Sequence, residues 1–511
     1  MRNGVLSLAL IPLLLFYAIP VGAAEKEQRT WTDEIVYSLM VDRFFDGNTK
    51  NNGDANVNDP SAFNGGDFEG VTKKLNYLKD MGYTAIILSP IFANEDKGYH
   101  GDWVTDFYKT DQHYGTMKEF KKLVNEAHDL DMKVILDFQA NNVGPHSSWL
   151  NEEDKQGWFH DKKEISNDGD QKLMETGWHD GLPDLNQDNE ATREYLLDAA
   201  KWWITETDID GYRLNKVQYV GEDFWKEFVD AVKSEKSNFY TIGDVNGDAD
   251  TISSYKETGI DAFMAYPQNG ALREAFSAPD KELKPVFNAF EDSEAKFGGK
   301  APQALFMDTQ GMPRFTKDAA DHNENPGSRW KMALSYLYTM PGVPIVFYGS
   351  EIALNGNLAP DNHKLMNFKT EQELVEYITK LSDLRDMHPA LTKGDMEILY
   401  EQGGASVFKR VYGKETMVVV MNNTSGTKTI KLSDKQLEKN KELRGMLNGD
   451  LVRSKDNSYT IVIDRETTEV YTLSPKSIIN IPYLIVIGLV LVIFAIFIAL
   501  VIKRSKRNQP K

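Results

Sequence analysis

The chain has 511 residues, of which 41% are hydrophobic, and its formal net charge is −19. That is enough apolar material for a large core and for more than one domain. The acidic balance argues against nucleic-acid binding, and the lack of cysteine excludes a disulfide framework.

The N-terminus has the pattern of a secretion signal. Arg2 gives it a positive start, residues 5–21 are almost wholly apolar, and residues 22–24 are small, as a cleavage site requires. We therefore predict a signal peptide over residues 1–24. An uncleaved anchor helix is the alternative.

Short β-branched runs then alternate with longer amphipathic runs. The expected strands are residues 34–40, 84–88, 133–138, 211–214, 239–245, 262–266, 304–308 and 343–348. Helical patterns lie between them, including residues 117–129 and 193–207. Eight strands separated in this way predict an α/β fold, a closed (β/α)8 barrel over residues 25–394.

Two segments break this rhythm. Residues 146–186 are polar and rich in Asp, Gly and Trp, so we expect a small inserted domain over about residues 143–188. After Pro389, short strands are expected at residues 407–410, 416–420, 429–432 and 459–463. Their regular spacing predicts an antiparallel β-sandwich domain over residues 395–475.

The C-terminus has the composition of a membrane span. Residues 483–502 carry no charge, and twenty helical residues cross a hydrocarbon core of roughly 30 Å. The tail, residues 503–511, is basic and contains no acid. By the positive-inside rule it stays in the cytoplasm, which predicts a single-pass cell-membrane protein with an extracellular ectodomain.

Several separated motifs occur in a fixed order between residues 31 and 475. They are VDRFFDGN (41–48), the GGDFEG segment (65–92), VTDFYKTDQHYGT (104–116), VILDFQANN (134–142), LPDLN (182–186), GYRLN (211–215), TIGDV (241–245), FMDTQGMPRF (306–315) and PGVPIVFYGSE (341–351). In this order they resemble the α-amylase family, glycoside hydrolase family 13, and within it the bacterial α-amylases and cyclodextrin glycosyltransferases. The resemblance implies a (β/α)8 barrel, a domain B after strand three, a C-terminal β domain, and a retaining reaction on α-glucans such as starch or maltodextrin.

The resemblance also implies calcium. The residues that match one metal loop of the family are Asp46, Asn48, Asn51, Asn52, Gly65 and Asp67. Hard oxygen donors on a Gly-rich loop suit Ca²⁺, although the same residue types dominate ordinary turns. Asn141 and Asp184 match a second site, whose further ligand would be the backbone carbonyl of Tyr219.

The residues at the three matching catalytic positions differ from those of the family. Retaining hydrolysis needs a nucleophile and an acid/base, two carboxyl groups roughly 5–5.5 Å apart. Asn215 stands at the nucleophile position, and an amide is a poor nucleophile. Asp244 stands at the acid/base position, one methylene short of the family's Glu, and Gly311 stands at the third-acid position.

Substrate-binding positions around these three are also altered. Arg213 is retained, but Asn142 and Gln310 stand where the family has histidines, and Asp102 replaces an aromatic residue. Because the scaffold motifs are intact while the pocket wall is changed, we expect ordinary α-amylase turnover to be absent or close to undetectable.

Three functions remain open. The first, which we favour, is α-glucan binding without cleavage, helped by aromatic residues expected in or beside the loops over the barrel mouth: Trp103, Trp149, Trp158 and Trp178. Packing inside the inserted domain is the alternative for each of them, and for Trp178, which precedes LPDLN, packing is the expectation. The second is an active hydrolase or glycosyltransferase with an unconventional site, in which Asp102 pairs with Asp244 in an inverting arrangement; the alternative is that Asp102 is a solvated loop acid. The third is an ectodomain scaffold for a membrane partner protein.

Overall fold

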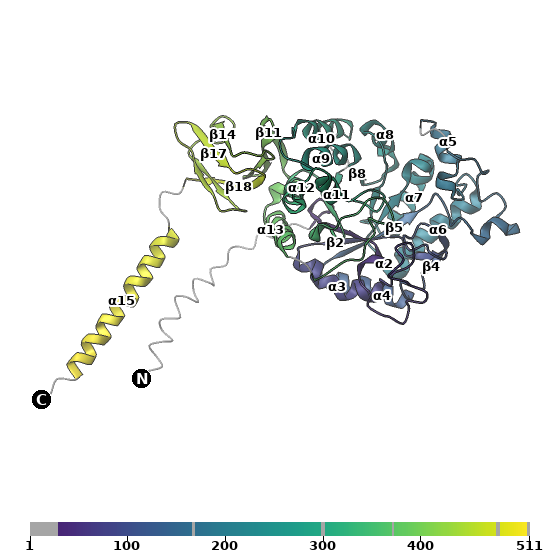
Figure 1. The fold of residues 1–511 in the computed structure, drawn as a ribbon, viewed down its shortest axis with the longest axis horizontal. Helices are drawn as coiled ribbons and strands as arrows, with labels where there is room; N and C mark the ends of the chain where they lie inside the picture. Colours follow the sequence, from purple (N-terminus) through teal and green to yellow (C-terminus); the bar gives the residue numbers. More distant parts are fainter. Residues whose placement is uncertain (1–28, 166–168, 298–301, 370–371, 477–480, 508–511) are drawn as a thin grey trace.

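The computed structural model describes residues 29–165, 169–297, 302–369, 372–476 and 481–507. The expected signal peptide, residues 1–24, lies outside these ranges. Figure 1 shows a barrel domain, a smaller β domain beside it, and a long C-terminal helix that stands apart from both.

Eight parallel strands close into a barrel in the order β1-β10-β9-β8-β7-β6-β5-β2. The strands are β1 (Val36–Leu39), β2 (Ala85–Leu88), β5 (Lys133–Gln139), β6 (Gly211–Asn215), β7 (Tyr240–Gly243), β8 (Ala262–Met264), β9 (Gln303–Phe306) and β10 (Val343–Phe347). Each expected strand is therefore present, with its ends shifted by a few residues. The predicted (β/α)8 barrel is confirmed.

Helices surround the barrel. They are α2 (Val41–Phe44), α3 (Phe68–Asp80), α4 (Met117–Asp129), α6 (Glu190–Thr207), α7 (Glu222–Glu235), α8 (Ala249–Ser254), α9 (Tyr266–Phe276), α10 (Lys284–Phe297), α11 (Phe315–Asp321), α12 (Pro326–Thr339), α13 (Glu373–Met387) and α14 (Pro389–Lys393). Helix α4 shows how local signals in a sequence specify a helix. Thr116 and Glu119 form a capping box at its N-terminus. Phe120, Leu123 and Val124 lie on its buried face. Short 3₁₀ helices join these elements: η1 (Trp31–Asp33), η5 (Val217–Tyr219), η6 (Tyr255–Thr258) and η7 (Ser350–Ile352).

The barrel interior is apolar on most strands but polar where β5 and β6 meet. The other six barrel strands are buried along their whole length, and most of their side chains are aliphatic or aromatic. Side chains alternate between the two faces of a strand, so Arg213 and Asn215 of β6 share one face. The guanidinium of Arg213 lies within 3.4 Å of the Ser38 hydroxyl on β1, which places that face inside the barrel.

The segment between β5 and α6 forms the expected inserted region. It contains η2 (Ser148–Asn151), η3 (Glu153–Lys155), α5 (Gln171–Thr176) and η4 (His179–Gly181). Its largest side chains pack inward, since the rings of Trp149 and Trp158 meet each other and the ring of Tyr195 on α6 at 5.3–5.5 Å between centroids. A hairpin of β3 (Phe92–Asn94) and β4 (Val104–Thr110) lies after β2.

The C-terminal domain is an antiparallel β structure, as predicted. A six-stranded sheet has the order β11-β12-β13-β18-β15-β16, and β14 pairs with β17 in a second sheet. The strands are β11 (Asp395–Gln402), β12 (Ala405–Tyr412), β13 (Glu415–Asn422), β14 (Lys428–Ser433), β15 (Lys441–Gly445), β16 (Leu451–Arg453), β17 (Ser458–Ile463) and β18 (Thr467–Pro475). The domain has an apolar cluster of its own, which includes Val420, Ile461 and Tyr471.

Buried polar contacts tie this domain to the barrel. Arg329 of α12 donates to Asn423 Oδ1 at 2.8 Å and to Glu466 Oε2 at 2.7 Å, while Asn423 donates to the Ala275 carbonyl at 2.8 Å. Arg410 of β12 donates to the carbonyls of Thr339 and Gly394. These bonds fix the orientation of the two domains.

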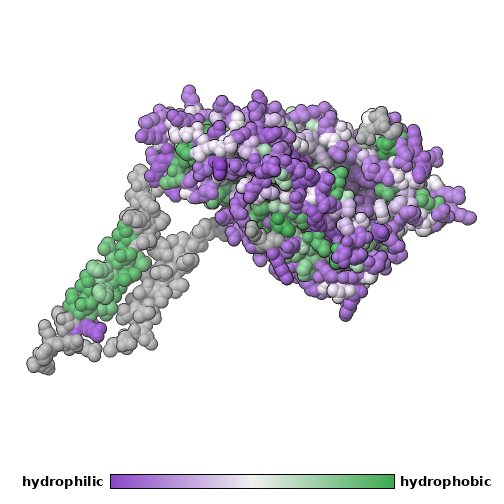
Figure 2. Space-filling view, viewed as in Figure 1, coloured by the Kyte–Doolittle hydropathy of each residue, from purple (hydrophilic) through white to green (hydrophobic). Residues whose placement is uncertain are grey.

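The last element is α15 (Ile481–Arg507). Residues 487–504 have a mean hydropathy of 2.6, and none of this window is buried against the rest of the described chain. Figure 2 shows it as an apolar rod beside a largely hydrophilic body. It is long and apolar enough to cross a membrane, and the crossing itself stays a prediction.

Candidate functional site at the barrel mouth

The ends of β5, β6 and β7 bring the central residues of the site together. In the parallel register Asp137 lies opposite Arg213 and Gln139 lies opposite Asn215. Asp244 follows β7 directly, and its backbone N–H donates to the Leu214 carbonyl at 2.9 Å. The nucleophile and acid/base positions are therefore neighbours at the carboxyl ends of adjacent strands, where barrel proteins place their chemistry.

Arg213 and Asp137 form a buried bidentate pair beneath Asn215. The Nε of Arg213 donates to Asp137 Oδ1 at 2.5 Å, and Nη2 donates to Oδ2. Burial works against the charge on Arg213, but Asp137 outweighs it and raises the pKa of the guanidinium. Arg213 thus stays charged, and its donors are turned to Asp137 and not to a ligand.

Asp244 is held by a neighbour that the sequence did not single out. Tyr266, at the start of α9, donates its hydroxyl to Asp244 Oδ1 at 2.8 Å. Burial raises the pKa of Asp244, while Arg213 and the Tyr266 hydrogen bond partly oppose the shift. The carboxyl group therefore has the raised pKa of a general acid, on a side chain shorter than glutamate.

A second polar group lies beside Asn215. The Oδ1 of Asn142 accepts from Gln139 Nε2 at 2.6 Å and from Lys216 Nζ at 3.0 Å, and its Nδ2 donates to the Asp102 carbonyl at 3.1 Å. Lys216 has a left-handed backbone, with φ of 55°. Sequence reasoning missed Lys216 and Gln139, although alternation along β5 from Asp137 points to Gln139.

Asp102 is more enclosed than a solvated loop acid. Only 28% of its side chain is exposed, and its carboxylate lies 3.2 Å from His100 Nδ1. Burial raises the pKa of Asp102, but the hydrogen bond and charge of His100, with help from Lys216, outweigh burial and lower it. Burial lowers the pKa of Lys216.

Gln310 and Gly311 lie on the loop after β9. The Gln310 carbonyl accepts from Asn362 Nδ2 at 2.9 Å and from His363 Nε2 at 2.8 Å. The other nitrogen of His363 lies 3.1 Å from the Tyr99 hydroxyl, which connects this loop to the hairpin that carries Asp102. A Cβ added to Gly311 would meet only Thr309 Oγ1, at 3.9 Å, so a side chain fits there.

The first expected calcium loop has donors that suit a cation. The side-chain oxygens of Asn51 and Asn52 are buried and have no hydrogen-bond partner among the described residues, and Asp46 lies 2.9 Å from the Asn52 amide nitrogen. Gly65 has φ of +95°, and a Cβ there would lie 3.0 Å from Asn52. Asp46, Asn51 and Asn52 therefore fit Ca²⁺.

Asp67 and Asn48, two other residues expected to bind this calcium, make hydrogen bonds within the protein. Asp67 caps α3, and its carboxylate accepts the backbone N–H groups of Gly47, Asn48 and Gly70. The side-chain oxygen of Asn48 accepts from the Lys50 backbone at 3.3 Å. They hold the loop in place, and their part as metal ligands stays a prediction.

The second expected calcium site is brought together from three segments. The Nδ2 of Asn141 donates to Asp184 Oδ1 at 2.5 Å and to the Tyr219 carbonyl at 3.1 Å, while its own buried Oδ1 has no partner among the described residues. Turning the amide would direct three oxygens at one point, as Ca²⁺ requires. Burial raises the pKa of Asp184 to about 7, and His160, 2.6 Å away, partly opposes this.

Of the tryptophans expected near the barrel mouth, Trp103 is half-buried on the hairpin after β2, edge-on to His100 with 4.9 Å between centroids, and Trp158 is half-buried against Trp149 and Tyr195. Trp149 packs inside the inserted region, and so does Trp178, whose Nε1 donates to the His160 carbonyl at 3.1 Å. For Trp149 the expected platform role is wrong, because ring faces in a packed core are not open to a ligand, whereas the packing of Trp178 was expected.

The family model "Alpha amylase, catalytic domain" matches residues 38–376, and "Alpha-amylase C-terminal domain" matches residues 394–471. The chain belongs to the α-amylase family. The boundaries agree with the barrel and the β domain of the structure.

Curated relatives of this α-amylase-family protein are longer than it is. It is 31% identical to a beta/alpha-amylase of Paenibacillus polymyxa over 86% of its own length, and 30% identical to a cyclomaltodextrin glucanotransferase of Geobacillus stearothermophilus over 80%. The matches span 38% and 62% of those two proteins, less than two thirds of each.

Solved structures match more completely. An Anoxybacillus α-amylase is 49% identical, with a TM-score of 0.87 over 88% of this chain and 100% of the other. An α-amylase of Geobacillus thermoleovorans, solved with acarbose, is 48% identical with a TM-score of 0.85, over 88% and 100%. These likenesses cover the barrel and the β domain together.

Proposed function

We propose that this α-amylase-family protein binds α-glucan at the barrel mouth and cleaves it at most very slowly, on the outer side of a cell membrane to which α15 anchors it. One observation carries the proposal. The end of β6, which presents the family's nucleophile, presents the amide of Asn215 beside a Tyr-bound Asp244.

The loss of rate follows from chemistry. An amide neither attacks the anomeric carbon nor balances the charge of an oxocarbenium-like transition state. Removing a nucleophile typically costs about 10⁴-fold or more in rate. Shortening the acid by one methylene moves its proton by roughly 1 Å, which can cost another 10²-fold.

Features that support binding remain in place. Asp102 and Lys216 offer a carboxylate and an ammonium group at the mouth, and Trp103 offers a half-buried ring on which a sugar face can stack. A relative of 48% identity was solved with acarbose, a sugar-like ligand. Calcium, where bound, would contribute a hard cation to the loops of Asp46 and Asn141 and hold their oxygens in place.

A specific observation favours a second candidate, an inverting hydrolase. The pKa of Asp244 is raised by burial, whereas the pKa of Asp102 is lowered by His100. Two carboxyl groups with pKa values pushed apart are the usual arrangement for an acid and a base. Release of reducing ends from starch that Asp244→Ala abolishes would establish this candidate; equal release by wild type and variant indicates a contaminant.

The binding proposal is tested by calorimetric titration of the full chain, in mild detergent, with maltoheptaose. We expect saturable heat with the wild type and weaker binding of maltoheptaose by the Trp103→Ala variant. Trp202→Ala, a change at a partly buried ring of α6 that packs on Tyr108, is the control and should bind as wild type does. No heat at millimolar maltoheptaose would contradict the proposal. The scaffold hypothesis stays a prediction.

A further inference from the structure

The C-terminal domain differs in charge from the barrel. Residues 395–475 contain twelve basic and twelve acidic residues, whereas the whole chain has a net charge of −19. The excess of acids therefore lies in the barrel. The domain that precedes α15 is thus the part of the ectodomain that an anionic surface repels least.

One end of this domain leads to α15. Strand β18 ends at Pro475, and the helix begins at Ile481. From Lys476 to Ile481 even a fully extended chain reaches at most about 18 Å. Because the uncharged run of the helix starts at residue 483, this end of the domain lies close to the lipid headgroups when α15 spans the bilayer.

Two loops and the last residue of the domain meet at this end. We call the surface that they form the exit face, and it consists of residues 434–441, residues 454–457 and Lys476. The backbone N–H of Lys476 donates to the Asn440 carbonyl, and its Nζ donates to the Ser454 carbonyl, both at 3.3 Å. The three segments are therefore neighbours on one surface.

The exit face is basic. It has five lysines and three acids, which are Lys435, Lys439, Lys441, Lys455 and Lys476 against Asp434, Glu438 and Asp456. Two of the acids have cationic partners, because Asp434 lies 3.4 Å from Lys439 and Glu438 lies 3.2 Å from Lys441. The other three lysines are exposed and make no ion pair with any residue that the structure describes. They are available to an anionic partner.

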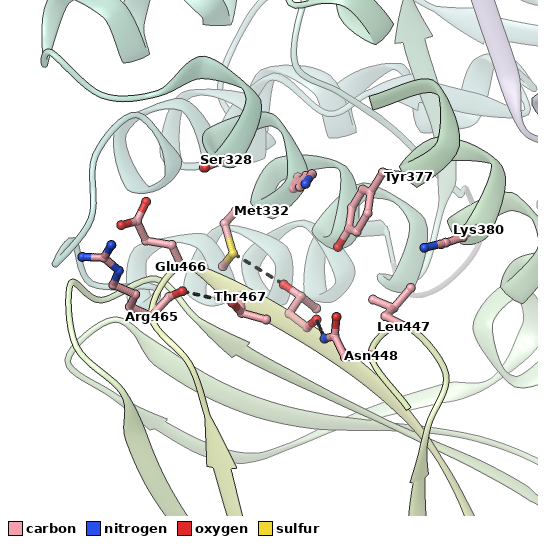
Figure 3. Close-up of a pocket in the computed structure, with 11 residues that line it drawn as sticks. Ser328, Met332, Tyr377, Lys380, Leu447, Asn448, Arg465, Glu466 and Thr467 are labelled. Carbon is pink, nitrogen blue, oxygen red and sulfur yellow. Dashed lines mark hydrogen bonds between the residues drawn. The ribbon is translucent and has the colours of Figure 1, made fainter. Parts of the chain in front are cut away.

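The opposite end of the domain is occupied by the barrel. Glu466, just before β18, is bound to the buried Arg329 at 2.7 Å, and Thr467 lies opposite α12 across the cleft shown in Figure 3. Strand β18 runs from this contact to the exit face, and nine residues of antiparallel strand cover about 30 Å. The exit face is therefore well separated from this contact with the barrel.

The exit face lies on the side of the barrel away from the mouth. Helix α14 shows this, because the Ala390 N–H donates to Glu415 Oε2 at 2.8 Å, while Lys393 Nζ lies 3.4 Å from Asp33 Oδ2. Glu415 starts β13, which is antiparallel to β18, so it is at the exit end of the domain. Asp33 precedes β1, at the end of the barrel opposite the mouth.

We propose that the exit face docks on anionic phospholipid headgroups of the membrane that α15 crosses, and so directs the barrel mouth away from the lipid. The inference rests on the proposed membrane anchoring. Each lysine meets its own headgroup, so no single anion has to reach more than one of them. A lysine near an anionic surface favours the docked state about fivefold, and the tether keeps the face at the surface, so weak contacts suffice.

The experiment uses the full chain in nanodiscs of phosphatidylcholine, alone or with an equal part of phosphatidylglycerol. Because the chain has no cysteine, Asn457→Cys places a single fluorophore on the exit face, and Asn151→Cys places one on the inserted region near the mouth. Energy transfer to a dye on the headgroups measures how close each label is to the lipid. We expect transfer from the Asn457 position to be about twofold or more higher with phosphatidylglycerol, and transfer from the Asn151 position to be small in both lipids.

Charge changes test the lysines directly. Lys435→Glu combined with Lys455→Glu should reduce transfer from the Asn457 position in phosphatidylglycerol discs to the value in phosphatidylcholine. Roughly 1 M salt should do the same to the wild-type chain, because it shortens the Debye length to about 3 Å. The matched control is Lys118→Glu combined with Lys226→Glu, at exposed lysines of the barrel helices, which should leave the transfer unchanged.

Equal transfer in the two lipids, or an equal loss in the control variant, would overturn the docking. Stronger transfer from the Asn151 position than from the Asn457 position would overturn the orientation. A full chain that does not enter the discs would overturn the anchoring and this inference together, whereas glucan binding is measured separately with maltoheptaose. The salt comparison needs no substitution of a lysine, so it decides the case if a variant is destabilised.

Discussion

Asn215 has nearly the shape of an aspartate, so its exchange changes chemistry without changing the barrel. Asn215 is 8% exposed and is the last residue of β6. Two residues earlier on the same strand, Arg213 is paired with Asp137 of β5. Gly311 likewise leaves space, because a Cβ there meets only Thr309 at 3.9 Å. The scaffold therefore should accept the family's carboxylates again.

This argument gives a prediction for a restored site. The triple variant Asn215→Asp, Asp244→Glu and Gly311→Asp should release reducing ends from starch at least about 10²-fold faster than wild type, since it returns the nucleophile of a retaining site and restores the length of the acid. Asn215→Asp alone should gain less, because the acid remains short. A triple variant that folds and binds maltoheptaose but stays inert would show that the mouth no longer positions the reacting sugar.

Substitution of Trp103 tests ligand binding, and substitution of a buried tryptophan tests core packing. The ring of Trp103 is half-buried beside His100. Trp103→Ala should weaken maltoheptaose binding by about 1–3 kcal/mol, the worth of a large aromatic contact, with little change in the thermal transition. Trp203→Ala, which empties a fully buried position on α6, should do the reverse and lower stability by about 3–5 kcal/mol.

At the scale of elements, a charged group joins α4, α7 and the start of β6. His128 Nε2 lies 2.8 Å from Asp210 Oδ2, and Lys236 donates to Asp210 Oδ1 at 2.9 Å. The hydrogen bond to Asp210 raises the pKa of His128. Because the folded pKa lies above the unfolded value, this stabilisation is complete below the unfolded pKa of about 6.5 and is lost as pH rises through the folded value.

His128→Gln should therefore destabilise the protein more at pH 5.5 than at pH 9. We expect a loss of about 0.5–1 kcal/mol at the lower pH, as for a partly exposed ion pair, measured by denaturant unfolding at both values. Lys122→Gln, at an exposed lysine of the same helix, is the control and should show no such difference. An equal effect of His128→Gln at both pH values would contradict the charged pair.

The elements themselves were largely predictable. All eight barrel strands and α4 followed from short β-branched runs and an amphipathic pattern, which are local signals. In the β domain, β11, β15, β16 and β18 were missed. Strand β16 has three residues and no buried one, so it carries no periodic pattern, and β18 shows a weak one.

Only those site residues that belong to a family motif could be predicted from the sequence. Asn215, Asp244 and Arg213 were found from family patterns, and the structure places them together. The contact of Tyr266 with Asp244 and that of Lys216 with Asn142 join residues 22 and 74 positions apart. Such contacts are set by the closure of the barrel, and no local spacing reveals them.

At the scale of the whole molecule, Arg329 joins the two domains. It is fully buried and contacts Asn423 and Glu466 of the β domain. Arg329→Ala should cost about 3–5 kcal/mol, because it leaves buried partners unpaired. Scanning calorimetry should show a lower transition temperature, or two transitions in place of one. An unchanged melting profile would contradict this account of the interface.

The membrane helix makes a separate prediction for the intact cell. If α15 spans the bilayer, deleting residues 483–511 should move the protein from the membrane fraction into the medium, and protease added outside intact cells should degrade the wild-type barrel. Retention of the truncated chain in the membrane, or protection of the barrel, would show a different placement.

The central claim is that the barrel keeps its sugar site after losing the groups that break the bond. The most direct measurement combines maltoheptaose titration and a reducing-end assay on one preparation of the wild-type full chain. The account predicts saturable binding with turnover at or near background. Turnover at an ordinary amylase rate would contradict it, and so would the absence of binding.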